Sequence, residues 1–445
     1  MLLATAALAQ NGPAGQLPPP PPPQTKPAVQ TPPPRPPESQ PPGQGALPPA
    51  NAPTQNPPPQ PPPQNNPPPQ QNPPPPPPPP APQVGGPIAG LTPEQLAAWN
   101  AGLAQFLTVE NVASGLGPIF NDVSCVACHS NPAPGGSSPK FVTRFGRTTN
   151  GVFDPLESLG GSLLQARAIN PAVQEFIPPQ ANTIAHRQTP QLFGLGLIEA
   201  ISDTTIQALA LRPAVDGITG RAAIITDVVS GLQRVGRFGM KAQHATILAF
   251  SADAYLNEMG ITNPFFPTEN APNGKTALLA QFSTVSEPND TANPVTGRSD
   301  VNALADFQQL TAPVQPLPLT TRATAGQQVF SNIGCAICHV PQLTTGTNPI
   351  AALSNKPVGL YSDLLLHDMG ALGDGIGQAA ALPSEMRTPP LWGLRLRKTY
   401  LHDGRAPTLD AAIRAHAGQG QASNTRYTAL SANDQQALIE FLGSL

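Results

Sequence analysis

The sequence has few charged residues, no basic cluster and no long apolar run. Charged residues make up 11% of its 445 positions, and the net charge is −3. Without a basic cluster, nucleic acid and anionic membrane surfaces are poor candidates as partners. No later stretch holds eighteen uninterrupted apolar residues, so the sequence predicts no membrane span.

Proline is abundant instead, with 63 residues, more than half of them before residue 88. This tract has almost no aliphatic or aromatic side chains to bury, so it cannot form a core. Its prolines favour the polyproline II conformation at about 3 Å per residue. We interpret residues 10–88 as a disordered Pro-rich spacer; a ligand for proline-recognition modules is the alternative.

The first residues, "MLLATAALAQ", form a short apolar run that ends in Ala7-Leu8-Ala9. This ending fits the small-x-small cleavage rule of an export signal, although the basic segment that usually precedes the apolar run is missing. Residues 1–9 are therefore predicted to be part of an export signal, which implies a periplasmic or otherwise exported protein. A chance apolar start is the alternative.

From about Gly90 the pattern changes to amphipathic helices joined by Gly- and Pro-rich loops. Thr92 and Ser431 are expected N-caps of helices near the two ends of this region. Strand alternation is scarce, and "DGITGRAAIITDVVSG" could be a hairpin but has no evident sheet to join. We predict a mainly α fold with two domains, 90–316 and 317–445, separated at "QQLTAPVQPLPLTTRATAG".

All four cysteines lie in two copies of Cys-x-x-Cys-His, about two hundred residues apart. One helical turn brings the two thiols of such a motif to the same side, where both can bond to the vinyl groups of one haem. The histidine that follows is then an axial ligand of the iron. The motif residues are Cys125, Cys128 and His129, and Cys335, Cys338 and His339.

Two other uses of paired cysteines fit less well. Zinc sites built from Cys-x-x-Cys pairs usually space the pairs 15 to 20 residues apart. A thioredoxin-like pair requires a βαβ setting that the pattern lacks. Two covalently bound haem c groups agree with export, leave no cysteine for a disulfide, and supply apolar core to a chain with only 5% aromatic residues.

The sixth ligand of each iron decides between chemistry and electron transfer. In "PTLDAAIRAHAG" Thr408 can cap a helix in which Leu409, Ile413 and His416 share one face, so His416 points toward the core. His402, in "YLHDGRA", adjoins Asp403 in a tight turn that suits contact with a haem propionate. The other unassigned histidines are His186, His244 and His367.

The motifs resemble the dihaem oxidoreductases related to bacterial dihaem cytochrome c peroxidases, in the branch associated with peroxidase or thiol oxidoreductase activity. The similarity runs from about Gly115 to Leu445. It rests on ordered phrases that include "GLGPIFNDVSCVACH", "RQTPQLFGLGLIEAI", "NEMGITN", "RTPPLWGLR" and "YLHDGRAPTLDAAIRAHAG".

The resemblance implies roles for two further residues. In the relatives, the distal ligand of the C-terminal haem is a methionine or tyrosine at the position of His416, which makes His416 the expected ligand opposite His339. A glutamate before Met-Gly moves protons over the N-terminal haem, and Glu258 in "NEMG" occupies that place.

The chain departs from the relatives at two positions. Met240, in "GRFGMKAQ", stands where they place a tryptophan between the haems, which puts a tryptophan relay in doubt. His186, in "AHRQTP", lies near a loop that carries a removable distal histidine in resting peroxidases, so it is a candidate ligand of the N-terminal iron.

Three functions remain open. The favoured one is peroxide reduction at the N-terminal haem, with electrons passing through the C-terminal haem from a donor protein or small redox carrier. A non-catalytic dihaem electron carrier, with both irons six-coordinate, is the second. Oxidation of a thiol or of a protein side chain is the third.

If all four cysteines serve attachment, denatured protein should retain two haems. The double variant Cys335→Ala, Cys338→Ala should retain one, because the remaining motif still forms its two thioether bonds. Haem counted in the denatured protein by visible absorption checks both numbers. Haem that acidified solvent extracts from the unaltered chain would contradict covalent attachment.

Overall fold

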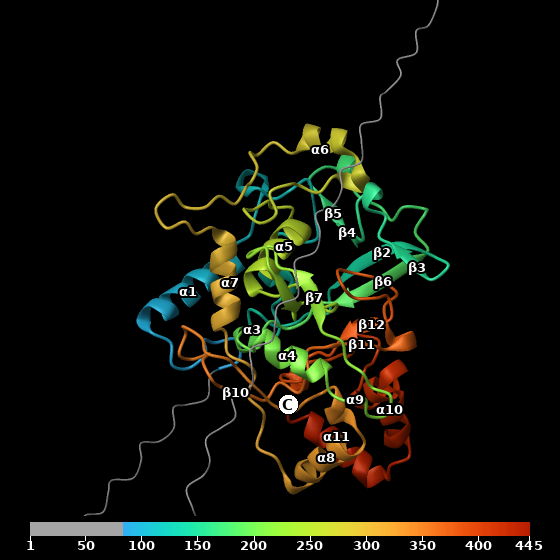
Figure 1. Ribbon diagram of the computed structural model, residues 1–445. Helices are drawn as coiled ribbons and strands as arrows, with labels where there is room; N and C mark the ends of the chain where they lie inside the picture. The colour runs from blue at the N-terminus through green and yellow to red at the C-terminus, as the bar shows by residue number, and fades with distance from the viewer. Residues whose placement is uncertain (1–82) are drawn as a thin grey trace, which may run out of the picture. The chain divides into compact units, whose positions relative to one another are not determined.

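The computed structural model describes residues 83–445 (Figure 1). In it, two pairs of packed helices bring together segments that are far apart in the sequence. The predicted export signal and nearly all of the predicted spacer lie outside the described residues. The end of that spacer is described: Ile88 N donates to Leu310 O at 2.8 Å and Ala312 N donates to Gly86 O at 2.9 Å. The described residues belong to one unit that runs to Leu445.

The helices are short and begin mostly at capping residues. Thr92 caps α1 with a capping box, and Ser431 and Thr408 accept from the first turns of α11 and α9, which confirms the three predicted caps. The α-helices are α1 Pro93–Leu107, α2 Cys125–Cys128, α3 Leu195–Glu199, α4 Asp203–Ala210, α5 Ile247–Met259, α6 Thr276–Phe282, α7 Asp300–Leu310, α8 Thr321–Asn332, α9 Leu409–Arg414, α10 Gln421–Thr428 and α11 Ala432–Leu442.

The first helix pair is α1 against α7, and it depends on a glycine. A Cβ on Gly102 would lie 2.2 Å from Ala303 O and 2.8 Å from Phe307 N, so only glycine allows the two backbones to approach so closely. One turn further along α1, the rings of Phe106 and Phe307 pack with centroids 4.7 Å apart. The pair therefore combines a close backbone crossing with an aromatic contact.

The second pair, α8 against α11, repeats this arrangement. A Cβ on Gly326 would lie 1.9 Å from Ala437 O, and Phe330, one turn further along, packs against Phe441 with ring centroids 5.5 Å apart. Figure 1 shows α8 beside α11 and α1 beside α7. The two helix pairs thus use the same glycine and phenylalanine positions, four residues apart.

Strands form one four-stranded sheet and several two-stranded ribbons. In the sheet β2 pairs antiparallel with β3, β4 and β6; the ribbons are β1 with β5, β7 with β8, β9 with β10, and β11 with β12. The strands are β1 Ile119–Phe120, β2 Phe141–Thr149, β3 Val152–Asp154, β4 Leu163–Leu164, β5 Arg167–Ala168, β6 Thr183–Gln188, β7 Ala223–Thr226, β8 Gln233–Gly236, β9 Leu343–Thr344, β10 Pro357–Val358, β11 Leu366–Asp368 and β12 Glu385–Arg387.

The strands correct two expectations. The segment "DGITGRAAIITDVVSG" holds only β7, the first strand of a hairpin, because its partner β8 lies just after the segment. The bridge from Arg221 to Leu366 connects this hairpin to β11. The mainly α interpretation missed the sheet of β2 and β6. In this sheet the usual alternation of apolar interior and polar exposed side chains is inverted. β2 leaves Phe141 exposed and turns the side chain of Arg144 toward the interior.

The core crosses the predicted boundary between 316 and 317. One cluster joins Ile198, Val235 and Ile247 to Leu353 and Trp392. The boundary itself falls in the segment between α7 and α8, and the division into two domains stays a prediction. Within residues 83–445, none of the helices is both long and apolar enough to span a bilayer.

A buried charge cluster also joins the two regions. The Asp374 carboxylate accepts from Arg187 Nε at 2.8 Å and lies 2.8 Å from Lys241 Nζ, and both its side chain and that of Lys241 are fully buried. Burial alone would raise the pKa of Asp374, but the two cations hold it below its usual value. The ionised carboxylate compensates two buried positive charges.

Asp374→Asn should therefore destabilise the protein by about 3–5 kcal/mol, since it leaves buried cations uncompensated. The measurement is the free energy of unfolding of the purified protein in urea. Asp154→Asn is the control, because Asp154 forms a half-exposed pair with Arg147 that contributes about 0–1 kcal/mol. Equal losses for the two variants would contradict the role given to Asp374.

Candidate haem sites

The first Cys-x-x-Cys-His motif forms the single turn α2, capped by Ser124, and presents His129 at its end. His129 Nδ1 donates to Pro190 O at 2.9 Å, with Gly136 O at 3.2 Å. This bond places the proton on Nδ1 and leaves Nε2 as the nitrogen with a free electron pair. Burial lowers the pKa of His129 to about 4, so the imidazole is neutral.

The second motif has the same design on a 3₁₀ turn, Cys335–Ile337. His339 Nδ1 donates to Tyr361 O at 3.0 Å, and burial lowers the pKa of this imidazole to about 4 as well. The phenylalanine of each helix pair lies over its histidine at the same centroid distance, 6.4 Å for Phe106 with His129 and for Phe330 with His339. The chain therefore builds one histidine site twice.

The four cysteines of the two motifs form no disulfide. Burial raises the pKa of Cys125 and of Cys335 to about 12, so both are neutral at pH 7. A redox-active pair needs a lowered thiol pKa, whereas the pKa of the first cysteine of each motif is raised.

A cavity of about 320 Å³ adjoins the second motif. Its walls include Cys335, Cys338, His339 and His416, and it extends to Met240. Most of the remaining walls are aliphatic or aromatic. Such a cavity can enclose an apolar group that two histidines contact.

His416 lies just beyond the end of α9 rather than within it. Its Nδ1 donates to Ala412 O at 2.8 Å, which leaves Nε2 for another partner, as in His129 and His339. Met369 and His416 both border Gly420, where a Cβ would come within 3.3 Å of each side chain. The structure thus brings His416 to the cavity that His339 lines, with Met369 as a neighbour.

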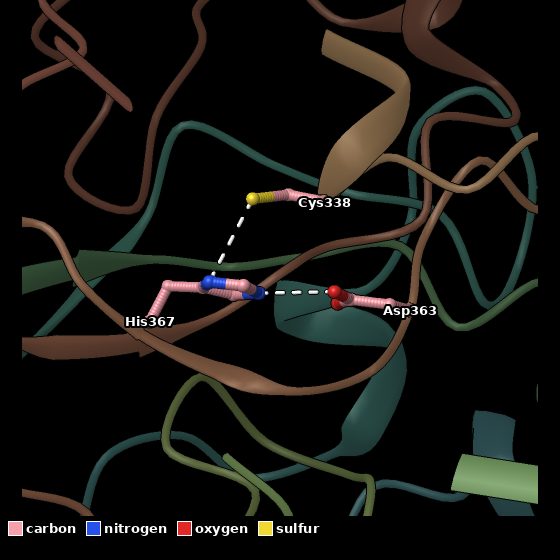
Figure 2. A group of neighbouring side chains, drawn as sticks. All are labelled: Cys338, Asp363 and His367. Atoms are coloured by element: carbon pink, nitrogen blue, oxygen red, sulfur yellow. Dashed lines mark hydrogen bonds and ion pairs between the residues drawn. The ribbon is translucent and has the colours of Figure 1, made fainter. Parts of the chain in front are cut away.

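Figure 2 shows a three-residue group, Cys338, Asp363 and His367. Cys338 and His367 line the same cavity. His367 Nε2 lies 3.0 Å from Asp363 Oδ2, and its Nδ1 lies 2.8 Å from Gln419 Oε1. Burial alone would lower the pKa of His367, but Asp363 and Cys338 raise it to about 10. Both ring nitrogens are engaged, so His367 suits an iron less well than His416 does.

Glu258 lies beside the first motif. Its backbone carbonyl accepts from Asn121 N at 2.7 Å, and its Oε2 accepts from Asn121 Nδ2 at 2.7 Å. Asn121 stands shortly before Cys125 in the sequence. Burial raises the pKa of Cys128 to about 11, and the Glu258 carboxylate is among the charges that add to this. Burial also raises the pKa of Glu258 itself, against the hydrogen bond from Asn121.

Arg144 was not anticipated from the sequence, yet it shares this environment. It projects from β2 with Nε buried and without a hydrogen-bond partner, while Nη1 lies 3.4 Å from Ser162 Oγ. Burial lowers the pKa of Arg144 to about 10, and its charge acts on Glu258. The burial of Arg144 gives no sequence signal, because it results from the pairing of β2 with β6.

His186 lies apart from this group. It is exposed on β6 and its Nδ1 lies 3.2 Å from Thr143 Oγ1. Alternation along β2 and β6 puts His186 on the face opposite to Arg144 and Arg187. The structure therefore does not bring His186 together with Glu258, and its role as a ligand stays a prediction.

Residues 178–445 match the family model described as "Di-haem oxidoreductase, putative peroxidase". The chain belongs to this di-haem oxidoreductase family. It is therefore a peroxidase-like oxidoreductase of a family that binds two haems. The match begins after the first motif and contains the second. No curated protein matches the chain by sequence.

Three solved structures show distant similarity. Hydrazine synthase from Kuenenia stuttgartiensis is 15% identical, with coverage of 80% of this chain and 89% of that one and a TM-score of 0.37. The dihaem peroxidase BthA from Burkholderia thailandensis is 14% identical, with 78% and 86% coverage and a TM-score of 0.36. A MauG-like protein associated with microbial copper homeostasis is 15% identical, with 81% and 92% coverage and a TM-score of 0.37.

The cavity of this di-haem oxidoreductase suits a haem in its charges as well as in its apolar lining. Arg387 lines it, donates to the carbonyls of Gly239 and Thr388, and has a pKa that burial lowers to about 10. Arg397 lines it too and donates to Thr399 O. Buried guanidinium groups whose partners are neutral carbonyls suit an anion, and haem carries two propionates. His402, in its predicted turn, also faces the cavity.

Replacing His416 by glycine should open the sixth position of the iron bound to His339. His416 lines the same cavity as His339, and its Nδ1 is bonded to Ala412 O, so Nε2 is the nitrogen left for an iron. The variant should convert a low-spin signal to high-spin and bind added imidazole. Electron paramagnetic resonance of the oxidised protein makes the measurement. An unchanged spectrum would reassign the ligand to Met369, His367 or His402.

Proposed function

We propose that this protein is an exported dihaem c-type peroxidase, which reduces peroxide at the site of His129 and takes electrons through the site of His339. The observation that carries the proposal is the partly buried Glu258 carboxyl beside the first motif, with a raised pKa. The family membership supports a peroxidase-like enzyme; the assignment of roles to the two sites is our proposal.

Covalent attachment is supported by the two motifs. Each pairs two cysteines with a histidine whose Nδ1 donates to a backbone carbonyl. These bonds orient each imidazole before a haem binds and raise the basicity of Nε2. Bound there, haem supplies the iron that exchanges electrons with peroxide.

At the first site Glu258 is proposed to move protons. Reduction of hydrogen peroxide to two waters consumes two electrons and two protons, and a carboxyl near the peroxide can take a proton from one oxygen and return it to the other. Asn121 holds Oε2 of Glu258, which leaves Oε1 for this exchange. Arg144, with its unpartnered Nε, adds a buried positive charge that favours negative charge on the leaving oxygen.

At the second site two imidazoles suit electron transfer rather than chemistry. His339 and His416 line one cavity, and a haem held there by both imidazoles would have no position left for peroxide. The electrons would come from an external donor protein or small redox carrier. Met240 lines this cavity, so no indole stands at the position that relatives use between their haems.

Export is supported by the predicted signal in residues 1–9 and by the attachment chemistry. Haem c is joined to its cysteines outside the cytoplasm, so a periplasmic or otherwise exported location follows if both motifs carry haem.

The electron-carrier alternative differs from this proposal in one measurable respect. It leaves no iron open to peroxide.

Glu258→Gln should lower peroxide turnover with an artificial electron donor by a factor on the order of 10² to 10⁴. The amide keeps the shape and the hydrogen-bonding capacity of the side chain but cannot accept the proton. Haem content and resting spectra should stay unchanged. Steady-state turnover of the partly reduced protein makes the measurement.

Glu269→Gln is the matched control. Glu269 is another buried acid whose pKa burial raises, to about 8, and its carboxylate accepts from Asn270 N rather than from the segment before Cys125. It should leave turnover unchanged. A Glu258 variant as active as the unaltered chain would remove Glu258 from the chemistry, and an unaltered chain that ignores peroxide even when partly reduced would favour the electron carrier.

A further inference from the structure

The carbonyls that hold the two axial histidines belong to segments that contact each other. His129 donates to Pro190 O, and the next residue, Gln191, donates from Nε2 to Trp392 O. One peptide bond and one side chain therefore connect the first imidazole to the backbone of the segment that contains Trp392. Pro190, Gln191 and Trp392 all line the cavity of the second motif.

The connection continues to the second histidine. The residue before Trp392 is Leu391, whose N donates to Leu360 O at 2.9 Å. The residue after Leu360 is Tyr361, whose carbonyl accepts from His339 Nδ1 at 3.0 Å. Four hydrogen bonds and the short covalent segments between them thus form an unbroken path from His129 to His339, which we name the His129–His339 relay.

Two glycines make the central contact of this relay possible. Gly393 has φ +72°, and a Cβ there would lie 2.4 Å from Gln191 Oε1, so a larger residue would displace the amide. A Cβ on Gly194 would lie 2.8 Å from Trp392 Cζ2. Both glycines stand in the phrases "RQTPQLFGLGLIEAI" and "RTPPLWGLR", to which the proposed peroxide chemistry gives no other role.

We propose that the His129–His339 relay is the electron path between the two haem irons, with Gln191 as the residue that closes it. With haem held at both histidines, each passage would carry one electron from the iron at His339, which would be oxidised, to the iron at His129, which would be reduced. An external one-electron donor then restores the first iron. The proposal rests on the proposed function, because it takes both irons to be bound by these histidines.

The relay is continuous in covalent bonds and hydrogen bonds, unlike a route through a side-chain ring. Electronic coupling falls far less across a bond or a hydrogen bond than across a gap between atoms. Met240 cannot take the place of an indole, since a thioether is much harder to oxidise. The relay needs no oxidisable side chain, and it joins both irons through the ligands that contact them directly.

The test uses the complete dihaem protein without peroxide. A photochemically generated one-electron reductant reduces the iron bound to His339, and absorbance follows the electron to the iron bound to His129. Gln191→Leu keeps the size of the side chain but removes the donor to Trp392 O, so the transfer rate should fall by on the order of tenfold or more. Haem content, spin states and both reduction potentials should stay unchanged.

Two variants make the result specific. Gln308→Leu removes a buried amide that donates to Ser251 Oγ away from the relay, and it should leave the rate unchanged. Trp392→Phe removes the indole but keeps the carbonyl, so it should also transfer at the normal rate. If Gln191→Leu does not fold, Gln191→Asn shortens the same side chain by one methylene and should slow the transfer.

An unchanged rate in the Gln191 variant would overturn the proposal. A transfer rate that falls only in Trp392→Phe would overturn it, because the electron would then pass through the indole ring. A lower rate in the Gln191 variant that is explained by changed reduction potentials would overturn it as well. Because the measurement involves no peroxide, failure of the Glu258 test leaves it intact. Haem counting beforehand separates it from failure of the two-haem assignment.

Discussion

The structure depends on two hydrogen bonds from buried imidazoles to backbone carbonyls. His129 and His339 each donate from Nδ1 to a carbonyl supplied by a distant segment, at Pro190 and Tyr361. Burial keeps both rings neutral, and the bonds set their orientation. The glycine crossings at Gly102 and Gly326 place a phenylalanine over each ring, so the helix pairs and the histidine sites form one repeated unit.

The two copies differ in what surrounds them, and this difference supports the division of labour that we propose. Around the first motif the structure gathers Glu258, Asn121 and Arg144, groups that move protons or stabilise charge. Around the second it provides a mostly apolar cavity that both His339 and His416 line. Polar groups over one site suit chemistry on a small oxygen compound, whereas two imidazoles suit electron transfer.

Contacts between the two regions hold these sites in a fixed relation. Asp374 joins Arg187 and Lys241 in a buried charge cluster, and an apolar cluster that includes Ile198 and Trp392 lies across the same boundary. Electron transfer between two sites is sensitive to their separation, so a rigid connection has a functional value beyond stability. The Gln191 contact with Trp392 belongs to this connection.

Local chemistry made several features predictable from the sequence. Cys-x-x-Cys-His encodes its own turn and histidine placement, and the caps at Thr92, Thr408 and Ser431 act over three residues, so no distant contact was needed to anticipate them. The family followed from ordered phrases, and the family model confirms it. His416 was expected to face the core, and it lines the cavity although α9 ends before it.

Tertiary structure decided what depends on distant partners. The pairing of β2 with β6 buries Arg144 and exposes His186. Neither burial nor exposure could be predicted from these strands, because polar residues stand at interior positions and apolar residues at exposed ones. The carbonyls that orient the histidines come from residues whose side chains are irrelevant to the bond, so they leave no trace in composition. The relay through Gln191 likewise exists only because two loops about two hundred residues apart meet at glycines that admit the contact.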